Sequence, residues 1–329
     1  MLARLRSAIT PPPAGGLAEA QRHLDSLTKP PGSLGRLEEI AARLAALAGG
    51  APRVERPHIF TFAADHGVVA EGVSAYPQIV TVQMVETFLR GGAAVNVLAR
   101  QAEARVIVAD FGVANPIPGS PGLHSCPIAP GTANLARGPA MTRAQALQAL
   151  ETGARLAEQA LDAGADLLAT GEMGIGNTTA ASAIAAAITG AGPERVTGRG
   201  TGVDDATLAR KVDVVRRALA VNVPDARHAL FASHRSAEPG HAVMLEHLGL
   251  TPYLDLALRL GEGTGAALFI HLARAAARIW REMATFKSAG VSQSEGASTA
   301  PSEARGSAPE RERTPENEVA PAKPAPERR

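Results

Sequence analysis

The chain has 329 residues, 45% of them hydrophobic, and its 33 Lys and Arg residues nearly balance its 32 Asp and Glu residues. Such a chain can bury a large core, and a net charge of +1 provides no strong field that would favour nucleic acid or an acidic membrane surface. The single cysteine, Cys126, excludes a disulfide within the chain. No apolar stretch has the length of a membrane span and no signal-peptide pattern is present, so we expect a soluble cytoplasmic protein without nucleic-acid or membrane partners.

Short apolar segments alternate with helical patterns along the chain. The Pro- and Gly-rich segment 29–35 separates one predicted helix before it from another after it. Apolar runs of strand length follow at 58–64, 105–109 and 166–170, and helical patterns lie between them at 79–89 and 144–161. Buried strands that alternate with helices are typical of a parallel sheet covered on both faces. We therefore predict an α/β fold whose doubly wound, mainly parallel sheet is flanked by helices.

The end of the chain changes character twice. A last helix is predicted from about 265 to 283, because its apolar residues fall on one face. We expect a small helical subdomain, from about 1–50 and 265–287, within one domain of residues 1–287. From 288 to 329 only Val291 and Val319 carry apolar side chains larger than alanine, so this tail is expected to be disordered.

Polar loops follow the predicted strands at their carboxyl ends. The first two loops begin at Asp65 and Asp110, and the third covers 172–179. A late candidate strand, 229–232, leads into a fourth loop that begins at Ser233. Because ligands bind at the carboxyl ends of strands in open α/β sheets, the four loops predict one pocket.

The third loop has the most informative sequence, Gly171-Glu172-Met173-Gly174-Ile175-Gly176-Asn177-Thr178-Thr179. It is predicted to connect a strand to an alanine-rich helix. Its glycines allow a ligand to approach the backbone, and the first turn of the helix offers unpaired N–H groups, which predicts a phosphate site. The pattern is neither a P-loop nor a complete dinucleotide fingerprint, and a ligand-free glycine turn is the alternative.

Five motifs occur in a fixed order: KPPGSLGRL at 29–37, ADHGV at 64–68, GVSAYP at 72–77, GEMGIGNTT at 171–179 and RLGEGTG at 259–265. Together they resemble the nicotinate-nucleotide:dimethylbenzimidazole phosphoribosyltransferases of cobalamin assembly. The resemblance implies transfer of a phosphoribosyl group from nicotinate mononucleotide to 5,6-dimethylbenzimidazole, giving α-ribazole 5′-phosphate and nicotinate. It also implies a homodimer that needs no cofactor and no protein-bound metal.

The resemblance assigns roles to individual residues. Glu262 is similar in position to the catalytic carboxylate and suits a general base, and Glu172 would assist or orient the incoming base. The residues expected to hold the nucleotide and its phosphate are Gly174, Gly176, Asn177, Thr178, Thr179 and Lys211, with Asp110 and Ser233 added because they follow predicted strands. The benzimidazole pocket is expected to contain Tyr76, Gln83, Met173 and Leu260.

Each assignment has a less specific alternative. Without the resemblance, Glu262 reads as a solvated loop residue, Lys211 as a surface charge and Met173 as a core residue. Asp65, His66 and His234 also invite interpretation as metal ligands in a hydrolase. No pair of them has the i, i+4 spacing of a metal-binding helix, so hydrogen-bonded loop residues are the preferred interpretation.

One stretch departs from the family pattern. After residue 222 the family has another αβ unit, whereas here the segment 222–227 leads almost at once to the motif that begins at Ser233. Several tens of residues are missing, and so short a link cannot carry a crossover between parallel strands. Two functions therefore stay open: an enzyme with a trimmed sheet, or an impaired relative that binds nicotinate mononucleotide or benzimidazole without turnover.

Overall fold

The computed structural model describes Arg4, Ser7 and the ranges 12–115, 117, 120–218 and 231–289. Contacts divide the chain into two units, Met1–Val291 and Ser292–Arg329, and every described residue belongs to the first. None of the helices in the described part is long and apolar enough to cross a membrane. The segment 222–227, where the sequence departs from the family pattern, lies outside the described residues.

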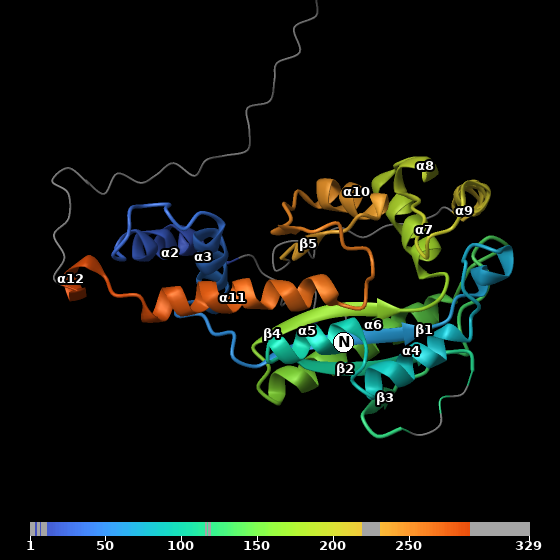
Figure 1. The fold of residues 1–329 in the computed structure, drawn as a ribbon, viewed down its shortest axis with the longest axis horizontal. Helices are drawn as coiled ribbons and strands as arrows, with labels where there is room; N and C mark the ends of the chain where they lie inside the picture. Colours follow the sequence, from blue (N-terminus) through green and yellow to red (C-terminus); the bar gives the residue numbers. More distant parts are fainter. Residues whose placement is uncertain are drawn as a thin grey trace, which may run out of the picture. The chain divides into compact units, whose positions relative to one another are not determined.

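Four parallel strands form the main sheet in the order β3-β2-β1-β4 (Figure 1). The central strand β1 (Pro57–Ala64) pairs with β2 (Arg105–Gly112) on one side and with β4 (Leu167–Met173) on the other, and β3 (Leu123–Ser125) lies beyond β2. The chain thus builds outward from β1 in one direction and then returns to its other side, which makes the sheet doubly wound. The predicted fold class is confirmed, although β3 was too short to be predicted.

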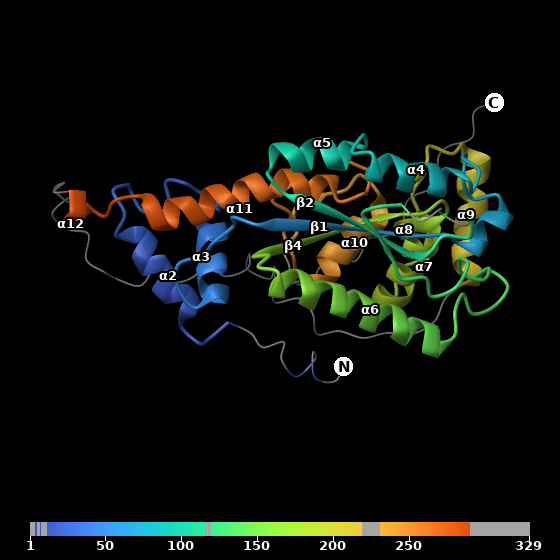
Figure 2. The ribbon, with the colours of Figure 1, turned by 90° about the horizontal axis from the view of Figure 1, so that it is seen from below.

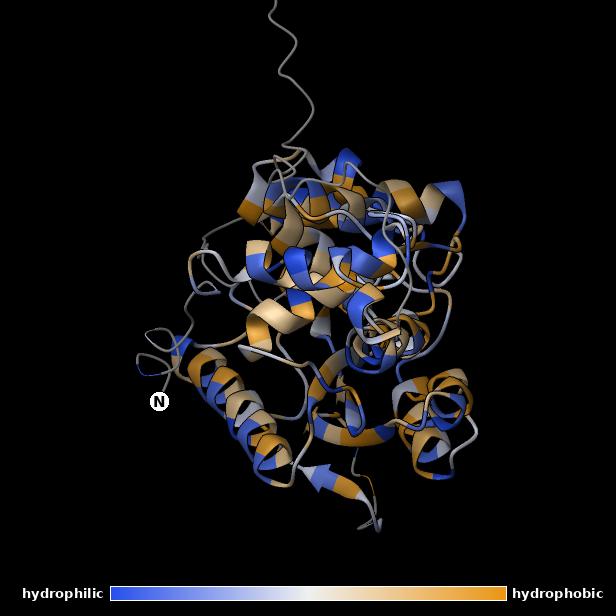
Figure 3. Cartoon of the chain, turned by 90° about the vertical axis from the view of Figure 1, so that its left-hand side faces the viewer, coloured by the Kyte–Doolittle hydropathy of each residue, from blue (hydrophilic) through white to orange (hydrophobic). Residues whose placement is uncertain are grey.

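Helices cover both faces of this sheet (Figure 2). The helices α4 (Val80–Leu89) and α5 (Ala94–Gln101) lie on one face, and α6 (Arg143–Asp162) lies on the other. Successive residues of β1 serve the two faces: Ile59 packs in a cluster with α4 and α5 residues, while Phe60 packs with Leu156 of α6. The helical ribbons accordingly carry hydrophilic and hydrophobic residues in alternation (Figure 3).

Helices from the two ends of the described chain pack together. α2 (Gly16–Asp25) contacts α3 (Arg36–Ala48), which in turn contacts α11 (Thr264–Glu282). The short helix α12 (Phe286–Ala289) runs past residue 287, so the predicted start of the tail at 288 falls inside a helix. The subdomain boundaries and the disorder of residues beyond 289 stay predictions.

A second group of helices follows the glycine turn (Figure 1). It consists of α7 (Asn177–Thr189), α8 (Pro193–Val196), α9 (Asp205–Arg217) and α10 (Pro239–Leu248). The strand predicted at 229–232 is wrong where the structure describes it: β5 covers only His234–Arg235 and pairs with β6 (Leu254–Asp255). The apolar side chain of Phe231 instead packs against Tyr253 and Phe269 from a segment without strand structure.

Candidate functional site

The glycine turn has the predicted connectivity, because β4 ends at Met173 and α7 begins at Asn177. Its glycines are required by packing as well as by backbone conformation. A side chain at Gly174 would collide with the carbonyl oxygen of Ala64, and Gly176, at φ +91°, would place a Cβ 2.8 Å from Val69 Cγ2. The sequence pattern alone could not separate this packing requirement from ligand approach.

Several N–H groups of the turn are already engaged within the fold. The Ile175 N–H donates to Thr81 Oγ1 at 3.2 Å, and the N–H groups of Asn177 and Thr179 donate to carbonyl oxygens of Gly174 and Gly176. The turn therefore offers fewer free backbone donors than the sequence predicted. A phosphate there would depend more on side chains than on amides.

Lys211 supplies a charge beside this turn. It projects from α9 and is 1% exposed, so the interpretation as a solvated surface charge is wrong. Its Nζ donates to Thr178 Oγ1 at 3.1 Å and to the carbonyl oxygen of Gly198 at 2.8 Å. Burial lowers the pKa of Lys211, and the nearby Glu238 opposes this effect. The structure thus places a buried ammonium beside the first turn of α7.

Sequence reasoning missed the loop 198–202, which packs against Thr178 and Lys211. A side chain at Gly200 would collide with Thr178 Oγ1 and crowd Lys211 Nζ. The Gly200 N–H donates to Glu238 Oε1 at 3.1 Å, and Arg259 Nη1 donates to the Gly200 carbonyl oxygen at 2.9 Å. Arg259 and Glu238 also line a second cavity of about 370 Å³. The alternating glycines of 198–202 were the available signal.

Glu262 lies in the turn that begins α11. It is 4% exposed, and its Oε2 is buried without a hydrogen-bond partner in the described part of the chain. Burial raises the pKa of the Glu262 carboxyl above its usual range. The interpretation as a solvated loop residue is therefore wrong.

Glu172, on β4, lies close to the same turn. A Cβ added at Gly261 would stand 2.7 Å from Glu172 Oε1. Desolvation and then repulsion from Glu262 raise the pKa of Glu172 to about 7, while a hydrogen bond from Asn177 opposes the rise. Glu172 is nevertheless exposed to solvent where it lines a neighbouring cleft, and solvent screening makes this rise smaller. The fold thus brings together two carboxyl groups that are ninety positions apart in sequence.

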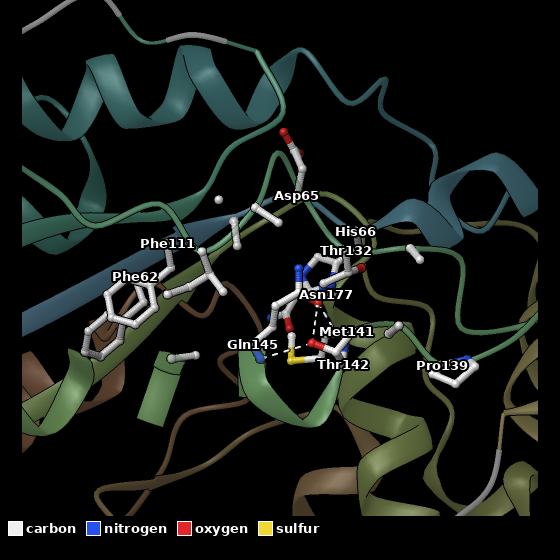
Figure 4. A pocket seen from close by; sticks show the side chains of 18 of the residues that line it. Phe62, Asp65, His66, Phe111, Thr132, Pro139, Met141, Thr142, Gln145 and Asn177 are labelled. Carbon is white, nitrogen blue, oxygen red and sulfur yellow. Dashed lines mark hydrogen bonds between the residues drawn. The ribbon is translucent and has the colours of Figure 1, made fainter. Parts of the chain in front are cut away.

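A cleft of about 670 Å³ opens at the carboxyl ends of β1, β2 and β4 (Figure 4). Phe62 and Phe111 form one apolar side, with their rings edge to face at 5.0 Å between centroids. His66 and Asn177 contribute polar groups, and burial lowers the pKa of His66 so that its ring is neutral at pH 7. Of the predicted site residues, Glu172, Met173 and Asn177 line this cleft.

Three predicted benzimidazole residues do not line the cleft. Tyr76, Gln83 and Leu260 are exposed, at 54% for Tyr76 and 55% for Leu260. Met173 lines the cleft and also packs against the main core, so it is a core residue, and its contact with benzimidazole stays a prediction. The structure therefore does not gather the four predicted residues in this cleft.

The two residues predicted from strand ends have local roles. Asp110 Oδ1 accepts hydrogen bonds from the N–H groups of Gly112 and Val113 and so shapes the end of β2. Ser233 Oγ lies 3.2 Å from His234 Nδ1, and the His234 ring stacks with His241. Among the residues that the structure describes, no three His, Cys, Asp or Glu side chains gather closely enough to hold a metal ion.

Comparisons with known proteins agree with the motifs. A family model described as phosphoribosyltransferase matches residues 9–230 and 221–291. The chain is 48% identical to nicotinate-nucleotide–dimethylbenzimidazole phosphoribosyltransferase from Chloroflexus aggregans, over 83% of this chain and 93% of the relative. The chain belongs to this family. A second relative of the same name, from Desulforamulus reducens, is 46% identical over 89% of this chain and 99% of its own.

A solved member of the family has the same fold. The crystal structure of CobT from Thermus thermophilus matches with a TM-score of 0.81 and 48% identity, over 84% of this chain and 99% of the other. The deletion is visible in the alignments too. The match to the Chloroflexus protein spans 328 positions but covers 83% of 329 residues, about 273, so about 55 positions of the relative have no counterpart here. The two segments matched by the family model meet at 221–230, around the predicted deletion.

Proposed function

We propose that this chain transfers the phosphoribosyl group of nicotinate mononucleotide to 5,6-dimethylbenzimidazole, releasing nicotinate and forming α-ribazole 5′-phosphate for cobalamin biosynthesis. The observation that carries this proposal is the buried, unpartnered Oε2 of Glu262 beside Glu172, in the part of the chain that the structure describes. Family membership supports it, and nothing in the comparisons favours the impaired alternative that binds without turnover.

Glu262 acts as the general base. One ring nitrogen of the benzimidazole donates its N–H to the Glu262 carboxylate, which accepts the proton. The other ring nitrogen attacks the anomeric carbon from the side opposite the nicotinate, which inverts that carbon. The bond from the anomeric carbon to the pyridinium nitrogen breaks, and nicotinate leaves with the electron pair.

Glu172 supports this step through its own protonation. With its pKa raised to about 7, much of Glu172 carries a proton at neutral pH. A neutral Glu172 does not repel a charged Glu262, so Glu262 can stay ionised and ready to accept a proton. Asn177 holds the Glu172 side chain through a hydrogen bond.

The phosphate is assigned to the corner formed by Thr178 and Lys211. The Lys211 ammonium has three N–H donors, of which two are engaged with Thr178 and Gly198. Thr179 is fully buried in the first turn of α7, and Gly174 and Gly176 let the turn pack closely against Ala64 and Val69, so these three residues are proposed to position α7 beside the phosphate. The charge of Lys211 would offset that of a phosphate group.

The apolar cleft is assigned to an aromatic ring of a substrate, because Phe62, Phe111 and Met173 present flat or adaptable surfaces. The exposed residues Tyr76, Gln83 and Leu260 are proposed to contact the benzimidazole on the side of the ring that faces solvent. Asp110 is proposed to support the nucleotide site through the end of β2 that it shapes, and Ser233 through its contact with His234. A homodimer and a cytoplasmic location are proposed from the resemblance.

The test is direct. Purified protein is mixed with nicotinate mononucleotide and 5,6-dimethylbenzimidazole, and α-ribazole 5′-phosphate is measured by chromatography and mass spectrometry. We expect product to accumulate together with an equal amount of nicotinate. Calorimetric binding of either substrate without any product would overturn the proposal in favour of the impaired alternative.

A further inference from the structure

The turn that carries Glu262 has an uncommon backbone. Gly261, Glu262 and Gly263 all lie in the left-handed region, at φ values of +80°, +60° and +88°. Two of these residues are glycines, for which the conformation is easy, but Glu262 has a side chain. A residue of this kind keeps such a conformation only where its surroundings determine it.

The sheet supplies those surroundings. Thr61 Oγ1, in the middle of β1, donates a hydrogen bond to the carbonyl oxygen of Glu262 at 3.3 Å. Gly171 of β4 stands opposite Thr61 in the strand register, and any side chain there would collide with the backbone of Glu262 and Gly263. The turn therefore packs directly on Gly171 and is hydrogen-bonded to β1 through Thr61.

A threonine at this position is not required by strand packing. Thr61 is fully buried on the face of β1 opposite Phe60 and Phe62, where valine would have nearly the same shape and no hydroxyl to satisfy. The hydroxyl instead donates across the sheet to the Glu262 carbonyl oxygen. The Thr61 hydroxyl thus stabilises the turn and is not needed for packing of the core.

We propose that Thr61 is a positioning residue for Glu262: its hydroxyl holds the left-handed turn so that the Glu262 carboxylate stays buried beside Glu172. The inference rests on the proposed function, in which Glu262 is the base. Glu172 of β4 is a titratable group that interacts with Glu262, and His234 of β5 lies against the first turn of α11 at Gly265; Ile59 and Thr61 of β1 and Thr264 of α11 contribute no charge.

The experiment compares two substitutions at this position. Thr61→Val removes the hydroxyl and keeps the shape, whereas Thr61→Ser keeps the hydroxyl. We expect kcat to fall about tenfold in T61V, the effect of losing one buried hydrogen bond, with KM for nicotinate mononucleotide within about twofold. T61S should stay within about threefold of the parent.

The matched control is Thr152→Val on α6. Thr152 is also buried, and its hydroxyl accepts a hydrogen bond from Arg155 at 2.9 Å, but it belongs to no part of the site. T152V should leave kcat unchanged. Equal losses of kcat in T61V and T61S, or a loss in T152V as large as in T61V, would overturn the inference.

A second measurement does not depend on turnover. The Glu262 carboxyl is titrated by carbon NMR in the parent and in T61V, with Glu262→Gln used to assign its signal. Release of the turn should admit water and lower the pKa of Glu262 toward its ordinary value. An identical titration in both proteins would overturn the role of Thr61.

These readouts distinguish failure of the proposed function from failure of the positioning role. If the parent makes no product, the proposed function fails, while the titration still tests Thr61. If E262Q loses activity but T61V matches the parent in both readouts, the base assignment stands and only the role of Thr61 is wrong. If T61V does not fold, Thr61→Ala replaces it, since it removes the hydroxyl and adds no atoms.

Discussion

Replacing Glu262 by glutamine tests the proposed chemistry most directly. The substitution keeps the size of the side chain but removes the proton acceptor, so turnover should fall by roughly 10²–10⁴-fold, the usual effect of losing a general base. Binding of nicotinate mononucleotide should change little, because the proposed phosphate contact is the separate corner at Thr178 and Lys211.

The same substitution should stabilise the fold. Burial raises the pKa of Glu262, so an ionised Glu262 is unfavourable at neutral pH. A neutral amide removes this cost. We therefore expect both the free energy of unfolding and Tm at pH 7 to rise in E262Q.

The assay measures the initial rate of product formation, calorimetric binding of nicotinate mononucleotide and thermal unfolding for the same preparations. Glu246→Gln on α10 is the matched control, because Glu246 is largely exposed and its carboxylate lies 3.9 Å from Arg195 in a surface ion pair. Turnover of E262Q within a few-fold of the parent would refute the assignment. A loss of turnover accompanied by a lower Tm would instead indicate misfolding.

Other parts of the molecule can be tested in the same way. Lys211→Met should raise KM for nicotinate mononucleotide at least tenfold, measured by steady-state kinetics, because it removes the buried charge assigned to the phosphate; an unchanged KM would refute that assignment. Because the pKa of Glu172 is raised to about 7, the stabilisation from its protonated form is complete below about pH 4.5 and is lost as pH rises through about 7. Glu172→Gln removes the destabilising charge that is present at high pH, so it should increase Tm more at pH 8 than at pH 5. An equal change of Tm at both pH values would contradict this. Deleting 290–329 should leave Tm and activity nearly unchanged, as scanning calorimetry would test, because this segment has too few apolar side chains to join a core. Inserting a relative's αβ unit at 222–227 should raise both Tm and turnover, because the loss of such a unit exposes apolar surface that the unit would cover; an unchanged Tm would show that the fold has accommodated the deletion.

The regular elements were predictable from the chain because their signals are local. The apolar runs and helical periods located β1, β2, β4, α4 and α6 to within a few residues. The three-residue β3 and the two-residue β5 carry too little pattern to be seen, and the apolar residues before His234 indicated burial that a loop also satisfies. The glycine turn was recognisable since its conformation is encoded within nine consecutive residues.

The site depended on contacts that no local pattern contains. The motifs contain Glu172 and Glu262, and the family resemblance added Lys211, but only tertiary packing buries Lys211 and brings the two carboxyl groups together. In the folded chain, several N–H groups of the glycine turn form internal hydrogen bonds, and Tyr76 and Leu260 are exposed. The physical reason is that burial, charge interaction and hydrogen-bond satisfaction are set by neighbours in space. The sequence determined which elements form and which chemical groups are available, whereas the folded sheet decided which of those groups meet and in what state of protonation.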